Sequence, residues 1–170
     1  MQKILILLAA MAFAQGSWAQ QAAQPVKPTL SSQIQIPVEK FKLKNGMTVI
    51  LHEDRSIPSF TYHQWYRVGS ANELPGRTGL AHFFEHLMFK GTKNYPKGTM
   101  DRLVRANGGD NNAFTTQDYT GYYTKLPSDK LDFIIPIEAD RMQNLLFDAG
   151  EIQSEREVVK EERRMRVEND

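Results

Sequence analysis

The spacing of apolar residues along the chain predicts strands in three segments. In residues 40–54, KFKLKNGMTVILHED, apolar side chains alternate with lysines, Asn45 and Gly46 provide a turn, and a β-branched run follows. This pattern predicts a β-hairpin. Residues 60–70, FTYHQWYRVGS, carry aromatic side chains at alternate positions, which predicts a long strand. Residues 111–126 are rich in Thr and Tyr and are typical of two strands or one bent strand.

The other segments have helical periodicity. They are a helix over about 78–89, a short helix within 97–109, a helix capped by Ser128 that extends through 131–147, and a charged helix from Ala149 onward. Gly108 and Gly109 are expected to close the second of these helices. Pro136 should kink the third helix or mark its true start. Clustered strands and helices that follow a hairpin predict an α+β fold, in which an antiparallel sheet packs against helices.

Residues 1–19 have the features of a secretory signal peptide. Lys3 gives a positive start, residues 4–14 are apolar, and small residues occupy the cleavage positions. The apolar run is too short to span a bilayer. Residues 20–37 are rich in Gln, Pro and Ser and are expected to form a linker to a fold that occupies residues 38–170.

Composition and charge narrow the class of protein. The chain is 41% hydrophobic and 24% charged, as in ordinary globular proteins. Its 21 basic and 20 acidic residues give no reason to expect nucleic acid or an anionic membrane as partner. The chain has no cysteine, so neither disulfides nor a cysteine-linked lipid anchor are expected. We therefore expect a periplasmic or secreted protein of a Gram-negative bacterium, without a membrane anchor once the signal peptide is removed.

The stretch HFFEHLMF, residues 82–89, carries the first candidate chemistry. On a helix, His86 lies about 40° and Glu85 about 60° from His82, whereas most nearby apolar side chains lie between about 100° and 200°. The polar trio should therefore share one face, away from the apolar core stripe. Two imidazoles one turn apart can hold one metal ion, and the glutamate can reach a water molecule on that metal. The pattern H-x-x-E-H is the inverse of the commoner H-E-x-x-H zinc motif.

A catalytic zinc site needs a third protein ligand and an open position. On the last helix, Glu162 lies about 20° from Glu155, and both fall within the only apolar stripe of that helix. Burying a carboxylate is unfavourable unless it is paired or binds a metal. Both could instead be half-exposed partners of Arg or Lys, but the upstream motif without a third ligand favours the metal. Glu161 lies off the stripe and is the poorer candidate.

Two separated motifs together resemble one enzyme family. GLAHFFEHLMFKGT, followed at the family's spacing by Glu162 within EREVVKEE, resembles the pitrilysin/insulinase family of zinc peptidases, in particular bacterial members similar to mitochondrial processing peptidase. Between them, GGDNNAFTTQDYTGYY resembles the family's substrate-strand motif, and LDFIIPIEADRMQNLLF resembles the helix before its third ligand. The resemblance covers about residues 38–168.

The resemblance implies a mitochondrial processing peptidase-like domain that holds one zinc ion. His82 and His86 would be zinc ligands and Glu162 the third. Glu85 would be the general base. Glu155 matches an acidic residue close to the site that would orient a ligand.

The resemblance also implies a substrate class. Asn112, Ala113 and Phe114 match a strand edge that pairs with an extended peptide by main-chain hydrogen bonds. The implied activity is that of a zinc-dependent endopeptidase. The alternative is a non-catalytic peptide-binding subunit of the same fold that needs a partner chain. The presence of all the matching metal-site residues favours the enzyme over this alternative and over a zinc carrier.

Family members have tandem homologous halves that close around the peptide. This chain stops at VEND, within what should be the first domain, so we expect an N-terminal fragment of a metallopeptidase domain. A homologous second domain or a partner subunit would supply the rest, so the 170 residues alone could bind zinc without cleaving a peptide. His52 and His63 lack ligand spacing and are expected to have no metal role.

Overall fold

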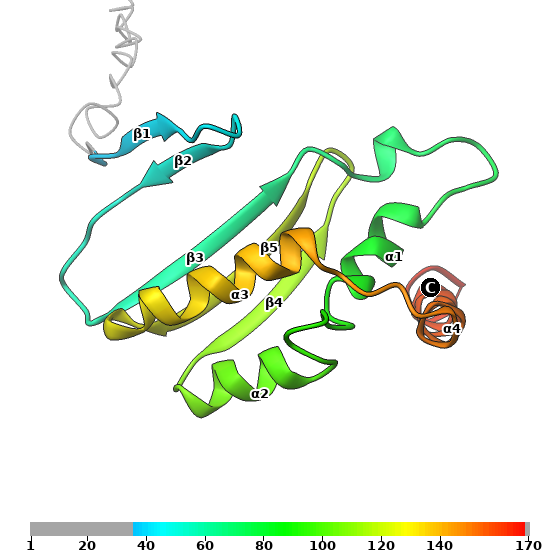
Figure 1. Cartoon of the computed structure of the whole chain (residues 1–170). Helices are drawn as coiled ribbons and strands as arrows, with labels where there is room; N and C mark the ends of the chain where they lie inside the picture. Colours follow the sequence, from blue (N-terminus) through cyan, green and yellow to red (C-terminus); the bar gives the residue numbers. More distant parts are fainter. Residues whose placement is uncertain (1–35, 169–170) are drawn as a thin grey trace, which may run out of the picture. The chain divides into compact units, whose positions relative to one another are not determined.

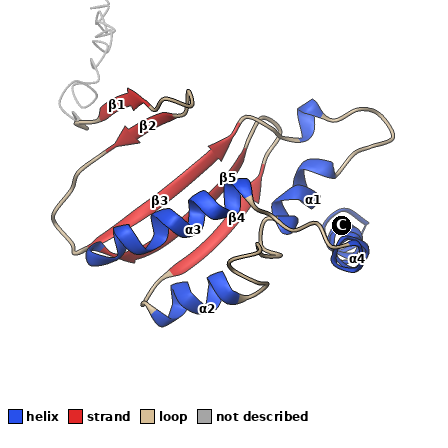
Figure 2. Cartoon of the chain, viewed as in Figure 1, coloured by secondary structure: helices blue, strands red, loops and turns tan. Residues whose placement is uncertain are grey.

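The computed structural model describes residues 36–168; the predicted signal peptide and most of the predicted linker lie outside the described residues. The chain divides into two compact units, one ending at Glu53 and the other beginning at Asp54. Antiparallel sheets and helices make up these units (Figures 1 and 2), which confirms the α+β class. Within the described part of the chain, no helix has the length and apolar character that crossing a membrane requires.

The first unit contains the predicted hairpin. Strand β1 (Glu39–Lys42) pairs with β2 (Thr48–Leu51) in antiparallel register. Gly46 adopts a φ of 87°, in the left-handed region that glycine tolerates, and the Asn45 side chain accepts a hydrogen bond from the Met47 amide at 3.0 Å. The Asn-Gly pair therefore forms the turn, as the sequence predicts.

The second unit is built on a three-stranded antiparallel sheet. Its strands are β3 (Ser59–Tyr66), β4 (Asp110–Thr115) and β5 (Thr120–Pro127), in the order β3-β5-β4 (Figure 1). The Thr- and Tyr-rich stretch is thus two strands rather than one bent strand. β5 is flanked on both sides, which is why most of its side chains are buried. β4 lies at an edge of this sheet in the described residues.

Two helices cover the sheet and form the core with it. Val104 of α2 (Thr99–Ala106) and Ile134 of α3 (Leu131–Gln143) are fully buried against Leu126 of β5. Both helices therefore pack on the face of the sheet to which Leu126 belongs, with α3 running along the strands (Figure 2). Burial of these aliphatic side chains is the main stabilising term for this unit.

The start of α3 differs from the prediction. A 3-10 turn (Ser128–Lys130) precedes α3, and Ser128 makes no side-chain capping hydrogen bond, so the predicted cap is wrong. Pro136 lies inside the helix and does not mark its start. Because proline lacks an amide hydrogen, it leaves the carbonyl one turn earlier without its helical partner. Packing of the apolar side chains on the sheet outweighs that loss.

The remaining two helices bring the candidate site together. Helix α1 (Leu80–Leu87) contacts both α4 (Ala149–Arg163) and β4. The Asp148 side chain caps α4 by accepting a hydrogen bond from the Glu151 amide at 3.0 Å, and a π-helical segment (Arg164–Glu168) follows α4. In Figure 1, α4 lies beside α1, so two distant sequence motifs face one another.

Candidate metal centre

The start of α1 is held by a carboxylate from the preceding loop. Glu73 accepts hydrogen bonds from the amides of Gly79, at 2.7 Å, and Ala81, at 2.8 Å. These first-turn amides have no partner within the helix, and an anion there also interacts favourably with the helix dipole. The sequence offered little signal for this contact, because Glu73 lies outside the expected helix. It fixes the helix that carries both histidines.

Three predicted ligand side chains converge between α1 and α4. The Nε2 atoms of His82 and His86 lie 3.1 Å apart. The Glu162 carboxylate places one oxygen 3.5 Å from the Nε2 atom of His82 and the other 3.7 Å from that of His86. In the described chain, these three residues form the only cluster of His, Cys, Asp or Glu side chains with a geometry that could hold a metal ion.

These distances fit one tetrahedral zinc ion. Zinc–ligand bonds of about 2.0–2.1 Å place neighbouring tetrahedral ligands about 3.3 Å apart. The two imidazole nitrogens are 3.1 Å apart, close to that value. The 3.5 and 3.7 Å separations run from these nitrogens to the two different oxygens of Glu162, so either oxygen lies near both histidines. Two imidazole nitrogens and one carboxylate oxygen are also a donor set found in catalytic zinc sites, where the fourth position is open. Glu162 also forms an ion pair with Arg166 at 3.4 Å, and the adjacent carboxylate, Glu161, pairs with Arg164 at the surface.

The protonation state of His82 and the orientation of His86 suit a metal. Burial lowers the pKa of His82, and the neighbouring His86 lowers it further, so the neutral form that binds metal is favoured. The Nδ1 atom of His86 lies 2.8 Å from a Glu155 oxygen, which leaves Nε2 free to face Glu162. Burial raises the pKa of Glu155, but hydrogen bonds from Lys90 and His86 outweigh this and hold it below its usual value. Glu155 therefore stays ionised beside His86.

Glu85 is held on the side of the site formed by β4. The Thr115 hydroxyl donates to a Glu85 carboxylate oxygen at 2.5 Å. The same hydroxyl oxygen lies 3.3 Å from the hydroxyl oxygen of Thr120. Thr120 in turn donates to the Val68 carbonyl at 2.8 Å. Sequence reasoning missed Thr115, although it lies in the strand motif beside Phe114. Its hydroxyl fixes one carboxylate oxygen and leaves the other available for chemistry.

The orientation of α1 corrects one expectation. His82, Glu85 and His86 share one face, as the helix angles predict, but this face lies toward α4 and β4 rather than away from the packed side. Glu85 is only 9% exposed, whereas Phe84 is 51% exposed. The polar side chains can be buried because Thr115 and the α4 carboxylates satisfy them. The apolar stripe of α1 is consequently only partly covered in the described chain.

An open groove joins the metal centre to the edge strand. Its lining includes His82, Glu85 and Glu162, together with the predicted substrate-binding residues Asn112, Ala113 and Phe114 of β4. All six belong to the second unit. The free edge of β4 and the candidate metal ligands are therefore exposed to the same space.

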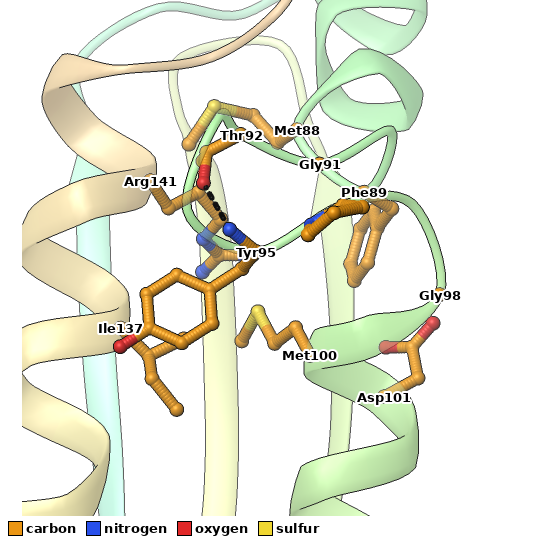
Figure 3. A pocket seen from close by; sticks show the side chains of 11 residues that line it. Met88, Phe89, Gly91, Thr92, Tyr95, Gly98, Met100, Asp101, Ile137 and Arg141 are labelled. Atoms are coloured by element: carbon orange, nitrogen blue, oxygen red, sulfur yellow. Dashed lines mark hydrogen bonds between the residues drawn. The ribbon is translucent and has the colours of Figure 1, made fainter.

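The remaining histidines and a small cavity are not part of this cluster. His52 contacts the Pro37 carbonyl through Nδ1 at 2.8 Å, and His63 stacks on Trp65, so neither joins the cluster. A cavity of about 20 Å³ lies between α3 and the loop after α1 (Figure 3). It has room for about one water molecule, so we regard it as a packing gap.

Comparisons with known proteins place this site in context. Residues 48–170 match the family model for insulinase (peptidase family M16). The chain is 39% identical over 132 residues to zinc protease PqqE of Helicobacter pylori. The aligned segment covers 77% of this chain and 30% of that protein. It is also 36% identical over 142 residues to cytochrome b-c1 complex subunit 1 of Bos taurus, which covers 84% and 28%.

A solved structure shares the fold. The first half of the periplasmic protease PqqL from Escherichia coli matches with a TM-score of 0.70 and 28% identity, covering 76% of this chain and 30% of that chain. This chain therefore spans less than a third of each of these relatives: 30% of PqqE, 28% of the cytochrome b-c1 subunit and 30% of the PqqL chain.

Proposed function

This chain belongs to the insulinase family, peptidase family M16, and we propose that it supplies the metal centre of a zinc-dependent endopeptidase. The observation that carries the proposal is the convergence of His82, His86 and Glu162, whose ligand atoms all lie within 4.8 Å of one another, with Glu85 beside them. Zinc as the cofactor is also supported by a relative named as a zinc protease.

The chain's own residues would each do one part of the chemistry. His82, His86 and Glu162 would hold the ion, which when bound supplies a water molecule of near-neutral pKa and polarises a peptide carbonyl. The Glu85 carboxylate would accept the proton of that water as its oxygen attacks the carbonyl, and would then deliver the proton to the leaving amine. The Thr115 hydrogen bond would keep this carboxylate oriented for both transfers.

The substrate would be a peptide in an extended conformation. β4 presents an unpaired edge in the described sheet, and Asn112, Ala113 and Phe114 line the groove that also contains Glu85. An extended chain can add to such an edge through main-chain hydrogen bonds, which read the backbone more than the side chains. Unstructured peptides therefore fit this groove better than folded proteins do.

A second homologous domain or a partner subunit would complete the enzyme. The matched segment is 30% of PqqE, and the PqqL structure is titled as the first half of a periplasmic protease. The same title, together with the leader-like residues 1–19, supports a periplasmic location as part of the proposal.

A non-catalytic peptide-binding subunit is the second candidate. It is favoured by the 36% identity to a protein named as a subunit of the cytochrome b-c1 complex. The two candidates differ in what Glu85 does. A binding subunit does not need a buried carboxylate held beside the metal ligands, and the presence of one here favours the enzyme.

The test compares zinc binding and peptide cleavage in the complete protein for the wild type, Glu85→Gln and a Glu161→Gln control. We expect Glu85→Gln to keep its zinc and to lose about 10²–10⁴-fold in kcat, because the general base is gone. A chelator should abolish wild-type cleavage. Wild-type zinc binding without cleavage would indicate the binding subunit, and full activity of Glu85→Gln would exclude this base.

A further inference from the structure

We infer that Lys90 is a positioning residue of the metal centre, whose ammonium group holds the Glu155 carboxylate on His86 and away from the metal. This inference rests on the proposed zinc function. The contact with Lys90 would explain why Glu155, a second buried carboxylate beside the histidines, does not become a metal ligand itself.

Both oxygens of Glu155 are engaged by side chains. One oxygen lies 2.8 Å from the Nδ1 atom of His86, and the other forms an ion pair with the Nζ atom of Lys90. The Glu155 residue is 8% exposed and the Lys90 side chain 15% exposed, so water competes little for this contact. Removal of one partner from a buried ion pair leaves an uncompensated charge and therefore has larger consequences than removal of one partner from an exposed pair.

The restraint matters because Glu155 and Glu162 are alternatives on the same helix. They lie about two turns apart on one face of α4, and both carboxylates contact His86. A catalytic zinc site needs three protein ligands and one open position. If Glu155 were free to turn, its carboxylate could occupy that position or draw His86 away from Glu162. With one oxygen on Lys90, it can only orient His86.

Lys90 is itself placed by a rigid turn. Its amide donates to the Leu87 carbonyl at 3.0 Å at the end of α1. Gly91 then adopts a φ of 97°, and a side chain there would approach the Lys97 amide to 2.4 Å, so the turn requires glycine. Leu146 donates to the Gly91 carbonyl at 3.1 Å, which ties this loop to the segment before α4 (Figure 3 shows the loop). The backbone at Lys90 is therefore held in place by the fold of this loop.

A second ion pair joins the same loop to the same helix and provides a matched control. Lys97 binds Glu151 of α4 at 2.7 Å, but the Lys97 side chain is 57% exposed and neither partner contacts a histidine. If Lys90 only fastened the loop to α4, removal of either lysine would have similar consequences. If Lys90 positions Glu155, only Lys90 should affect the metal.

The experiment measures zinc affinity of the full chain by competition with a chromophoric chelator, with thermal unfolding as a check of folding. The variants are Lys90→Met, Lys90→Arg, Lys97→Met, Glu155→Gln and the double variant Lys90→Met/Glu155→Gln.

We expect Lys90→Met to weaken zinc binding about 10–100-fold, as loss of partners behind metal ligands does. Lys97→Met should bind as the wild type does, and Lys90→Arg should largely restore affinity because it keeps the cation. The visible spectrum of the Co²⁺-loaded chain should change in Lys90→Met and not in Lys97→Met.

The double variant separates positioning from general stability. If Lys90 acts through Glu155, adding Lys90→Met to Glu155→Gln should weaken zinc binding little further. Equal effects of Lys90→Met and Lys97→Met, or an undiminished effect of Lys90→Met without the Glu155 carboxylate, would overturn the inference. Failure of the wild type to bind zinc would overturn the proposed function and this inference together, whereas the other outcomes leave the proposed function standing.

Discussion

The hydroxyl of Thr115 is the contact on which the orientation of Glu85 depends. It donates to one carboxylate oxygen at 2.5 Å from β4, the strand proposed to pair with the substrate. A proton acceptor must be held within hydrogen-bond reach of the water molecule that it activates. The same hydrogen bond therefore links the base to the strand on which the peptide would lie.

Replacement of Thr115 by valine keeps the shape of the side chain and removes the donor. We expect Thr115→Val to lower kcat of the complete protein about 10-fold or more while zinc affinity stays unchanged, since the contact orients the base and not a ligand. Thr116→Val is the control, because the Thr116 hydroxyl donates to the Tyr119 carbonyl and not to Glu85. Steady-state peptide hydrolysis measures kcat of both variants, and competition with a chelator measures their zinc affinity. Equal losses in the two variants would show that Thr115 has only a structural role.

Sequence reasoning could reach some of these residues and not others. Helix angles group His82, Glu85 and His86 and favour Glu162 over Glu161, because these relations are local to one helix. Thr115, Lys90 and Glu73 act on the site from neighbouring segments. Their roles follow from tertiary packing, and no local pattern predicts which loop carboxylate or hydroxyl will face α1.

Among the elements, α3 anchors the loop that follows α1. Asp140 of α3 accepts hydrogen bonds from Asn94 at 2.6 Å and Asn144 at 2.7 Å and also contacts the Thr92 hydroxyl. The hydrogen bond from Thr92, followed by those from the asparagines, holds the pKa of Asp140 below its usual value of 3.8. This loop contains Lys90 near its start, so its anchoring supports the metal centre.

The lowered pKa of Asp140 predicts how stability depends on pH. Because the folded-state pKa lies below the unfolded one, the carboxylate stabilises the fold fully above about pH 3.8 and loses this effect as pH falls through the folded value. The difference in melting temperature between the wild type and Asp140→Asn should therefore be largest near neutral pH and shrink in strong acid. Asp129 forms an exposed surface ion pair with Lys130. The Asp129→Asn variant should therefore melt at nearly the same temperature as the wild type at any pH. A difference for Asp140→Asn that does not change with pH would contradict this account.

Element types followed from the pattern more reliably than element ends and faces. The Asn-Gly hairpin has a strong turn signal and was predicted correctly. The Ser128 cap was predicted wrongly. The shared face of His82, Glu85 and His86 was predicted, but its burial against α4 and β4 was not, because burial depends on what packs against the helix. Apolar periodicity places a polar face in solvent by default, and only the partners on α4 and β4 reverse that for α1.

At the scale of the whole molecule, the second unit depends on one core between its sheet and helices. Ile134 of α3 is fully buried in this core, whereas the adjacent Ile135 is 47% exposed. Ile134→Ala should lower the free energy of unfolding by about 2–5 kcal/mol through lost burial and a cavity. Ile135→Ala should have a much smaller effect. Urea unfolding of the full chain measures both, and similar losses would contradict this arrangement of the core.

The fold class and the family could be predicted from the sequence, because the separated motifs and the clustering of strands and helices are visible in the sequence alone. The strand order could not. That β4 is an edge strand among the described residues, and that it lines the same groove as the candidate metal ligands, follows from pairing between distant segments. This arrangement connects the proposed substrate edge to the candidate metal centre and makes the peptidase proposal specific.

The central claim is that His82, His86 and Glu162 together hold one zinc ion. The most direct measurement is the zinc content and affinity of the purified full chain for the wild type, Glu162→Ala and Glu161→Ala. We expect one tightly bound zinc ion per chain in the wild type and in Glu161→Ala, and an affinity at least about 100-fold weaker in Glu162→Ala, since a direct ligand matters more than its outer partners. Wild-type zinc affinity in Glu162→Ala, or no zinc binding by the wild type, would contradict the account.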